Sequence, residues 1–458
     1  MPVADAISPE TIVGSGLCIG CGACAALSDD LAMGWDAFGQ LKPHSSRPGI
    51  RPDAFAAICP FSPLAANEDE IARERFPHPA QRDELIGCHE AVYVGHVAEG
   101  NFRHNGSSGG LVTWVASELM RADLVDAVAH VVETGGHNGG RFFDYSLTRD
   151  PDALPAGAKS RYYPVELSRI LQRIRDEPGR YAVVGVPCFI KAVHLLRRHD
   201  PMLRERIVFT LGLFCGHMKS ARLAESFAWQ MDVPFGEVER LDFRVKNESR
   251  PANWYRAHFL QRSGAVREED WWNLVDGDWG AGFFQNSACN FCDDVVAETA
   301  DIAFGDAWVE PFSSDGRGTN VVIIRSPTLL ALVRRGLSEK RLSLEPVDAA
   351  FVKETQAAGF RQRREGLAYR LSWHRTGLKP KKRVLPGMVG LAIRRRLIYR
   401  ARYSISRWSH RLFHLARRLH TRWLYTGWAR CAGTIYQGLA YSTGPLGRLF
   451  DWIEQRYR

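Results

Sequence analysis

Three cysteines within seven residues are the side chains best suited to chemistry in this sequence. Cys18, Cys21 and Cys24 form a C-x2-C-x2-C run, and a fourth cysteine, Cys59, is followed by Pro60. Bacterial ferredoxins use this triplet spacing and a separate Cys-Pro to hold [4Fe–4S] clusters. The small residues between the cysteines would let backbone amides approach the cluster sulfides. Zinc is the alternative, but structural zinc sites usually use paired C-x2-C knuckles, so the run predicts an iron–sulfur cluster.

A second set of cysteines is spread over about a hundred residues. Cys289 and Cys292 form a C-x2-C pair, whereas Cys188 and Cys215 each follow a run of apolar residues typical of a buried strand. The ends of parallel strands meet at one edge of a sheet, so remote cysteines there can converge. The four therefore predict a second [4Fe–4S] cluster. Buried apolar cysteines without a ligand are the alternative.

A turn of small residues precedes a helical pattern at Leu111. It runs from Asn105 through Ser107, Ser108 and Gly109 to Gly110. Free amides at a helix N-terminus favour an anion, and glycines allow its close approach. The turn is neither a dinucleotide fingerprint nor a phosphate-binding P-loop. A helix simply capped by serine is the alternative.

Two side chains near the cysteines are candidates for a proton source. Lys191 lies three residues after Cys188, and His217 lies two residues after Cys215. Either could supply a proton in a two-electron reduction. A surface lysine and a structural histidine are the alternative interpretations.

The elements that would position these residues alternate between strand and helix. Short apolar runs predict buried strands at residues 91–97, 127–133, 181–187, 207–215 and 319–325. Helical patterns lie at residues 109–121 and 189–198. This alternation is typical of an α/β domain.

The chain of 458 residues is long enough for several domains. We expect a mixed α+β and α/β fold, with a small ferredoxin-like [4Fe–4S] module ahead of the α/β domain and a helical basic extension behind it. The predicted segments are an iron–sulfur module (1–70), a charged linker (71–87), the α/β domain (88–330), a helical continuation (331–380) and a basic amphipathic tail (381–458).

Charge is distributed unevenly along the chain. Residues 381–458 hold 17 Lys and Arg against two acidic residues, so the remainder of a chain with net charge +9 carries −6. Within this tail an apolar row with helical spacing comprises Leu397, Ala401, Ile405, Trp408, Leu412, Leu415, Leu419 and Trp423. A basic row one residue earlier comprises Arg396, Arg400, Arg407, Arg411, Arg418 and Arg422.

Such a helix suits an anionic membrane surface, where arginines can extend toward the headgroups. Packing on the protein's own body is the first alternative and nucleic acid the second, although no nucleic-acid-binding motif accompanies the charge. The N-terminus lacks the features of a signal peptide, and no apolar run reaches the length of a spanning helix. We therefore expect a cytoplasmic protein without a disulfide framework, with the tail at the inner face of the membrane.

In their order along the chain, these motifs resemble the beta-subunit family of coenzyme F420 hydrogenases and dehydrogenases, which includes ferredoxin-dependent chlorophyll-pathway reductases. The resemblance runs from Cys18 to Arg325 and also rests on Lys159-Ser160, on Ala300–Asp306 and on Gly318–Arg325. It implies FAD, held in residues 88–330 beside the second cluster. By position it carries flavin contacts over to Ser107, Ser108, Gly109 and Gly110, and less specifically to Lys159, Ser160 and Thr319. Arg161 and Asn320 depart from the family's usual residues.

The resemblance implies an oxidoreductase that depends on flavin and iron–sulfur clusters. Electrons would pass from ferredoxin or reduced F420 through two [4Fe–4S] clusters and FAD to a substrate. The basic tail suggests an envelope-polysaccharide or lipid-linked precursor as that substrate. An electron-relay subunit of a larger redox complex and a ferredoxin-dependent tetrapyrrole reductase are the alternatives.

Overall fold

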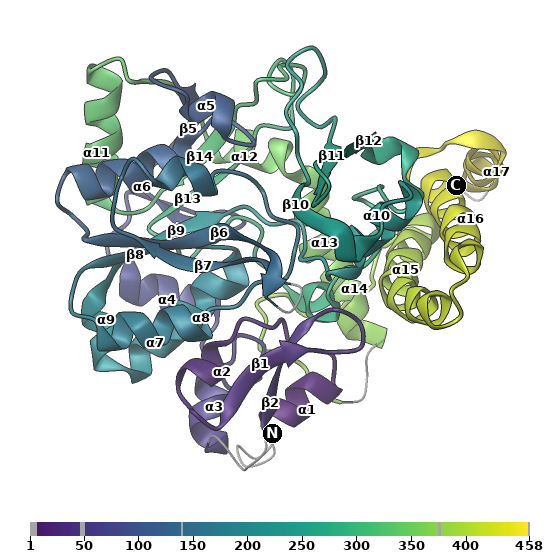
Figure 1. The fold of residues 1–458 in the computed structure, drawn as a ribbon, viewed down its shortest axis with the longest axis horizontal. Coiled ribbons are helices and arrows are strands. Elements are labelled where there is room, and N and C mark those ends of the chain that lie inside the picture. Colours follow the sequence, from purple (N-terminus) through teal and green to yellow (C-terminus); the bar gives the residue numbers. More distant parts are fainter. Residues whose placement is uncertain (1–6, 46–50, 139–140, 374–376, 457–458) are drawn as a thin grey trace.

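The computed structural model describes residues 7–45, 51–138, 141–373 and 377–456 (Figure 1). The strands are β1 (Leu31–Trp35), β2 (Leu41–Ser45), β3 (Gln81–Asp83), β4 (Gly87–His89), β5 (Ala91–Val97), β6 (Ala127–Asn138), β7 (Arg141–Thr148), β8 (Tyr181–Gly185), β9 (Ile207–Leu213), β10 (Val238–Asp242), β11 (Arg256–Gln261), β12 (Val266–Asp270), β13 (Ile302–Asp306), β14 (Asn320–Ile324) and β15 (Leu342–Pro346).

Helices fill most of the remaining chain. The α-helices are α1 (Pro9–Gly14), α2 (Ala23–Ala26), α3 (Pro52–Ile58), α4 (Glu68–Arg75), α5 (Phe102–Asn105), α6 (Leu111–Arg121), α7 (Ser168–Asp176), α8 (Pro187–His199), α9 (Pro201–Arg206), α10 (Arg222–Gln230), α11 (Pro327–Ser338), α12 (Ala349–Thr355), α13 (Ala357–Arg363), α14 (Glu365–Trp373), α15 (Ile393–Arg418), α16 (Arg422–Tyr441) and α17 (Gly444–Arg456). Short 3-10 helices are η2 (Leu154–Gly157), η3 (Phe235–Glu237), η4 (Trp271–Asn273) and η5 (Ser287–Phe291).

An eight-stranded mixed sheet in the order β15-β5-β14-β13-β9-β8-β6-β7 forms the centre of the molecule. The four strands β13, β9, β8 and β6 run parallel, whereas β14, β5, β15 and β7 pair antiparallel at the two sides. Parallel strands are usually covered on both faces, and the burial pattern of β8 agrees. Tyr181 and Val183 pack in the core beneath α7, α8 and α9, while Ala182 and Val184 face α6 and α11. The sheet is therefore the middle layer of three (Figure 1).

Two smaller units flank this sheet. The N-terminal unit contains α1 to α3 and the antiparallel β1–β2 hairpin, and α2 packs on α7 and α8 of the large domain. The second unit is the antiparallel sheet β10-β11-β12, whose apolar side packs against α10, α15 and α16. The last three helices form a layer at one end of the molecule (Figure 1).

The mixed α/β fold confirms the sequence prediction in outline, and each predicted strand and helix of residues 91–325 lies within a few residues of an observed one. Residues 71–87 contain the end of α4, the strand β3 and the first residue of β4. Their charged side chains pair with the body, as Arg75 does with Asp301 at 2.6 Å. Residues 331–380 contain a strand, β15, that the helical prediction missed.

Candidate redox site

The first cysteine group surrounds a cavity in the N-terminal unit. Its lining includes Cys18, Cys21, Cys24 and Cys59, and the remainder is almost entirely apolar side chains and glycines. Left-handed backbone at Gly20 and Gly22, with φ near 80°, turns the loop so that the three clustered cysteines share this cavity. A side chain at Gly20 would collide with the carbonyl oxygen of Leu41. Gly20 is therefore required by the packing of this loop against β2.

Burial makes these thiols difficult to ionise on their own. It raises the pKa of Cys59 to about 12, and the charge of Cys18 adds to that rise. Burial also raises the pKa of Cys21 and Cys24, and the charges of the other cysteines in the group raise it further. A positively charged metal centre is what converts such thiols into thiolates. The donor set therefore fits a [4Fe–4S] cluster, with Cys18, Cys21, Cys24 and Cys59 as the ligands.

The second group forms where two parallel strands end. Cys188 lies in the first turn of α8, directly after β8, and Cys215 lies two residues after the neighbouring β9. Cys289 and Cys292 come from η5 and its C-terminal end, and the Met218 amide donates to the Cys289 sulfur at 3.3 Å. Burial raises the pKa of Cys215 to about 12 and that of Cys289 to about 11, with the neighbouring cysteines contributing. The structure thus brings together four cysteines that are up to 104 positions apart.

The two groups are neighbours in one core. Cys21, Cys188, Cys289 and Cys292 belong to a single apolar cluster, and the charge of Cys21 affects the pKa of Cys188. A small pocket is lined by Ile19 and Gly20 of the first loop and by Met218, which follows Cys215 by three residues. Both cysteine groups therefore contact the same apolar core.

No set of three or more His, Cys, Asp or Glu side chains within the four described ranges could hold a single metal ion. A zinc ion with bonds of about 2.3 Å would draw its thiolates to about 3.8 Å from one another. A cubane binds each thiolate through a different iron, so its ligands are spaced more widely. The cysteine sulfurs of a [4Fe–4S] site are therefore expected to lie farther apart than those of a single-ion site.

Two arginines beside the second cysteine group were not predicted from the sequence. Arg363 at the end of α13 is 3% exposed, and its Nη2 donates to the carbonyl oxygens of Cys215 at 2.5 Å and Gly216 at 2.7 Å. Burial acts to lower the pKa of Arg363, but the charges of the surrounding cysteines outweigh it and raise the pKa. Arg402 of α15 donates to Gln285 at 3.0 Å and also affects the pKa of Cys289. Both come from segments without a recognisable motif, so only the fold places them here.

The turn before α6 gathers the residues expected at a flavin. The Ser160 amide donates to the Ser107 hydroxyl at 2.8 Å, and the Ser108 hydroxyl donates to the Thr319 carbonyl at 2.9 Å. Gly110 has φ +86°, and a side chain on Gly109 would come within 2.8 Å of the Asn320 side-chain oxygen. This Asn320 oxygen accepts a hydrogen bond from the amide of Leu111, the first residue of α6, at 3.2 Å. The glycines are therefore required by the packing of the turn itself.

Positive charge surrounds the same turn. The Lys159 Nζ lies 3.7 Å from the Asp242 Oδ2. Lys246, which the sequence did not single out, donates to the carbonyl oxygens of Arg103 at 2.5 Å, Ser108 at 3.1 Å and Arg317 at 2.7 Å. Burial lowers the pKa of Lys246 to about 8, and nearby cations add to that effect. Asn105 ends the short helix α5 ahead of the turn. The amides and cations here suit the pyrophosphate of a dinucleotide such as FAD.

The two proposed proton sources are both buried. Lys191 is 2% exposed, and its Nζ lies 3.1 Å from Glu68. His217 stacks on Trp279 at 4.3 Å, and its Nδ1 lies 3.1 Å from Arg402. Burial and then the neighbouring cations hold the pKa of His217 well below its usual range, so the ring is neutral. Lys191 and His217 thus flank the cysteine groups, as the sequence suggested, but from inside the core.

Comparison with known families identifies the central part of the chain. Residues 92–172 match the N-terminal model of the coenzyme F420 hydrogenase/dehydrogenase beta subunit, and residues 179–350 match the C-terminal model. The chain belongs to this beta-subunit family. The two matches together span more than half of the chain and include the α6 turn and all four cysteines of the second group. The resemblance inferred from the motifs is therefore confirmed, and the family is one of redox proteins, which supports an oxidoreductase in general.

A solved structure shows the same fold. One chain of the F420-reducing [NiFe] hydrogenase complex from Methanosarcina barkeri matches with a TM-score of 0.50 at 15% identity. The match covers 66% of this chain and 99% of that one. About a third of the present chain therefore lies outside the shared fold. No curated protein sequence matches the chain.

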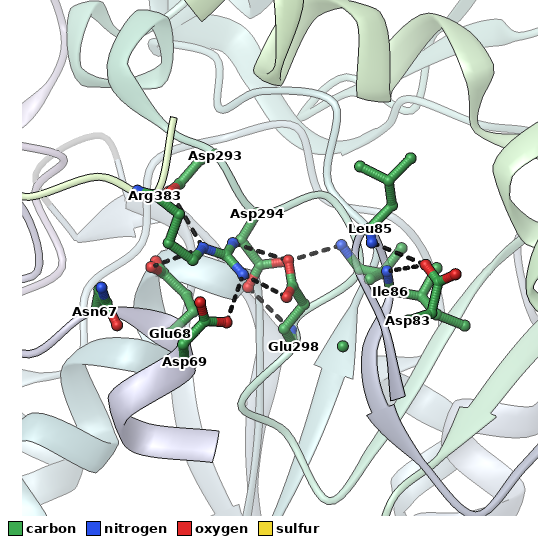
Figure 2. A network of polar contacts seen from close by, with 12 residues as sticks. Asn67, Glu68, Asp69, Asp83, Leu85, Ile86, Asp293, Asp294, Glu298 and Arg383 are labelled. Carbon is green, nitrogen blue, oxygen red and sulfur yellow. Dashed lines mark hydrogen bonds and ion pairs between the residues drawn. The ribbon is translucent and has the colours of Figure 1, made fainter. Parts of the chain in front are cut away.

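A buried ion-pair network joins the start of α4 and the residues after Cys292 to the segment that follows α14; Figure 2 shows its centre around Arg383. Lys382 lies 2.9 Å from Asp293, the residue after Cys292, and its ammonium also sits 5.1 Å above the Phe61 ring. Arg383 extends among Glu68, Asp69, Asp293 and Glu298, as Figure 2 shows. Burial acts to raise the pKa of Asp293, but Lys382 and Arg383 outweigh it and hold the pKa well below its usual range. Residues 381–383 thus form a strap between the two cysteine groups, in which the Lys382 and Arg383 side chains are buried and that of Lys381 is 40% exposed. No helix among the described residues is long and apolar enough to span a membrane.

Proposed function

We propose that this protein is an iron–sulfur flavoprotein oxidoreductase that moves electrons between a ferredoxin or F420 donor and a substrate of its own. The observation that carries the proposal is the collection of eight cysteines into two adjacent buried groups. When bound, [4Fe–4S] clusters pass single electrons, and FAD exchanges them for an electron pair carried as hydride. Residues 1–70 would hold one cluster, and residues 88–330 would hold the other together with FAD.

The chain's own residues have distinct tasks in this proposal. Four thiols bind each cluster, and the apolar cavity wall excludes water from the first one. Arg363 places a permanent positive charge beside the second group and stabilises added negative charge there. The amides of Ser108, Gly109 and Gly110, together with Lys159 and Ser160, hold and orient the flavin. An envelope-polysaccharide or lipid-linked precursor is the substrate class that the basic tail favours.

Anaerobic purification followed by assay of iron, sulfide and flavin tests the proposal. Two clusters and one flavin require about eight irons, about eight sulfides and one FAD per chain. Cys292→Ala should remove about half of the iron, because its cluster loses one of four ligands. Cys431→Ala is the matched control, since Cys431 is exposed on α16 and should leave the iron unchanged. Preparations that contain neither iron nor flavin would contradict the proposal.

The flavin site has a separate test. Lys159→Met should lower the FAD content, because one of the cations facing the turn is lost. Lys340→Met, at an exposed lysine on the loop after α11, should retain it. Equal FAD content in the two variants would contradict the proposal that the flavin binds at this turn.

One observation favours a second candidate function, an electron-relay subunit without its own substrate. The solved neighbour is a chain of a multi-subunit hydrogenase complex. Turnover of a small substrate by the purified chain with reduced ferredoxin supports an independent enzyme. Electron transfer only in the presence of a co-purifying partner supports the relay.

A further inference from the structure

Helix α15 has two unlike faces, and only one of them is covered. Its inner face packs in the core with α10 and α16 through Ile398, Ile405, Phe413 and Ala416. Most of the apolar row expected from the sequence lies on the opposite side and stays in solvent. Its exposed members are Leu397, Trp408, Leu415 and Leu419, between 41% and 57% exposed, followed by Trp423 at 73%. Trp423 lies at the start of α16.

The arginines of α15 divide in the same way. Inner or flanking ones bind the protein, as Arg402 does with Gln285 and Arg417 does with Glu225 at 3.1 Å. Arg400 is exposed as well, but it donates to the Tyr369 hydroxyl at 2.8 Å. The exposed arginines of the outer face are Arg407, Arg411 and Arg418. The Arg411 guanidinium lies 5.5 Å from the Trp408 ring centre, which is a cation–π contact. The outer face is therefore both apolar and cationic.

Acidic residues are missing from this whole part of the sequence. Between Glu365 and Asp451 the chain contains no Asp or Glu, whereas the remainder of the protein is mildly acidic. A surface that attracts anions and also buries Trp and Leu has the chemistry of an interfacial helix, whose tryptophans lie at headgroup depth and whose arginines meet acidic lipids.

We propose that the outer face of α15 docks on an anionic phospholipid membrane. The docking surface comprises Leu397, Trp408, Leu415, Leu419 and Trp423 with Arg407, Arg411 and Arg418. The inner face of α15 remains packed on the protein, so the helix lies along the membrane plane and holds the body beside it. This inference goes beyond the proposed function and does not depend on the clusters or the flavin.

Flotation of the full-length, anaerobically prepared protein with vesicles tests the proposal. Vesicles of phosphatidylglycerol and phosphatidylcholine in equal amounts should carry the protein upward, and pure phosphatidylcholine vesicles should carry much less. The binding should weaken as salt is added, because exposed charges are screened. Each exposed arginine near an anionic surface contributes enough that losing three should weaken the binding by well over tenfold.

Two variants and two controls separate the apolar and charged contributions. Trp408→Ala with Leu415→Ala should reduce binding to both vesicle types, and Arg407→Gln with Arg411→Gln and Arg418→Gln should abolish the preference for phosphatidylglycerol. Trp272→Ala removes a similarly exposed tryptophan, 56% exposed, from the β12 side of the body and should bind as the parent does. Arg262→Gln is the corresponding charge control. An unchanged far-ultraviolet circular dichroism spectrum shows that each variant is folded.

Three results would overturn the inference. The first is a failure of the parent protein to float with either vesicle type. The second is flotation that the α15 variants leave unchanged. The third is co-sedimentation with an acidic protein partner through this face in the absence of any vesicle binding.

Discussion

Replacement of Lys382 by methionine tests how strongly the strap of residues 381–383 holds the molecule together. The Lys382 side chain is 3% exposed and that of Asp293 is 0% exposed, with 2.9 Å between their charged atoms. Methionine keeps most of the side-chain volume but removes the charge, so the Asp293 carboxylate loses its nearest cation inside the core. Arg383 remains near Asp293, with its Nε at 3.3 Å.

The expected cost follows from the burial of the pair. Removing one partner of a buried ion pair typically destabilises a protein by about 3–5 kcal/mol, because the other charge is left uncompensated. The remaining Arg383 contact puts Lys382→Met near the lower end, at about 3 kcal/mol. Combining it with Asp293→Asn removes both charges, so the double variant should cost less than the sum of the two single variants, by about 1–3 kcal/mol.

Urea unfolding at neutral pH, followed by tryptophan fluorescence without oxygen, measures these costs. Glu268→Gln is the matched control, because it breaks the Arg256–Glu268 pair, whose side chains are 37% and 36% exposed. Exposed pairs contribute about 0–1 kcal/mol. The reasoning is refuted if Lys382→Met costs no more than this control, or if the double variant shows no coupling.

Three further predictions follow from the site. Arg363→Met should lower the midpoint potential of the second cluster, because the reduced state loses a nearby positive charge. A redox titration followed by electron paramagnetic resonance measures this potential. Arg361→Met, at an exposed arginine of the same helix, should leave the potential unchanged. Burial lowers the pKa of His410 to about 4 from an ordinary 6.5, so its share of stability is complete above pH 6.5 and is lost as the pH falls through about 4. That share is about 3 kcal/mol, and His410→Asn should flatten thermal stability between pH 6.5 and 4; an unchanged slope would contradict the assignment. Lys246→Met should reduce FAD content in quantified preparations, because the carbonyl of Ser108 in the α6 turn and those of Arg103 and Arg317 beside it lose their shared donor.

The sequence predicted the two cysteine groups because short spacing and strand ends are local signals. Cys18, Cys21 and Cys24 need only a tight loop, and Cys188 and Cys215 need only two neighbouring parallel strands. The contribution of Arg363 was not predictable, since a buried arginine in an ordinary charged helix looks like a surface residue until the fold covers it. Chain topology, which no local pattern records, decides that placement.

The tail shows the same limit more sharply. Spacing of three and four residues identified a real apolar row, but five of its eight members are exposed on the outer face, whereas Ile405 is buried. The inner face also uses small and polar residues such as Ser406, Ser409 and His410. Those positions carry little hydrophobic signal. They are buried because they bond to neighbouring elements, as Ser409 does when it accepts the Phe284 amide at 2.9 Å.

The shared core of the two cysteine groups also limits how the protein can be divided. Residues of the N-terminal unit such as Ile12, Phe55 and Phe61 pack in the same apolar cluster as Phe189 of α8 and Phe291 of η5. A fragment that begins after residue 70 would therefore present bare apolar surface beside Cys188 and Cys292 and would tend to aggregate. The apolar surroundings of the second cysteine group are therefore complete only when the N-terminal unit is in place.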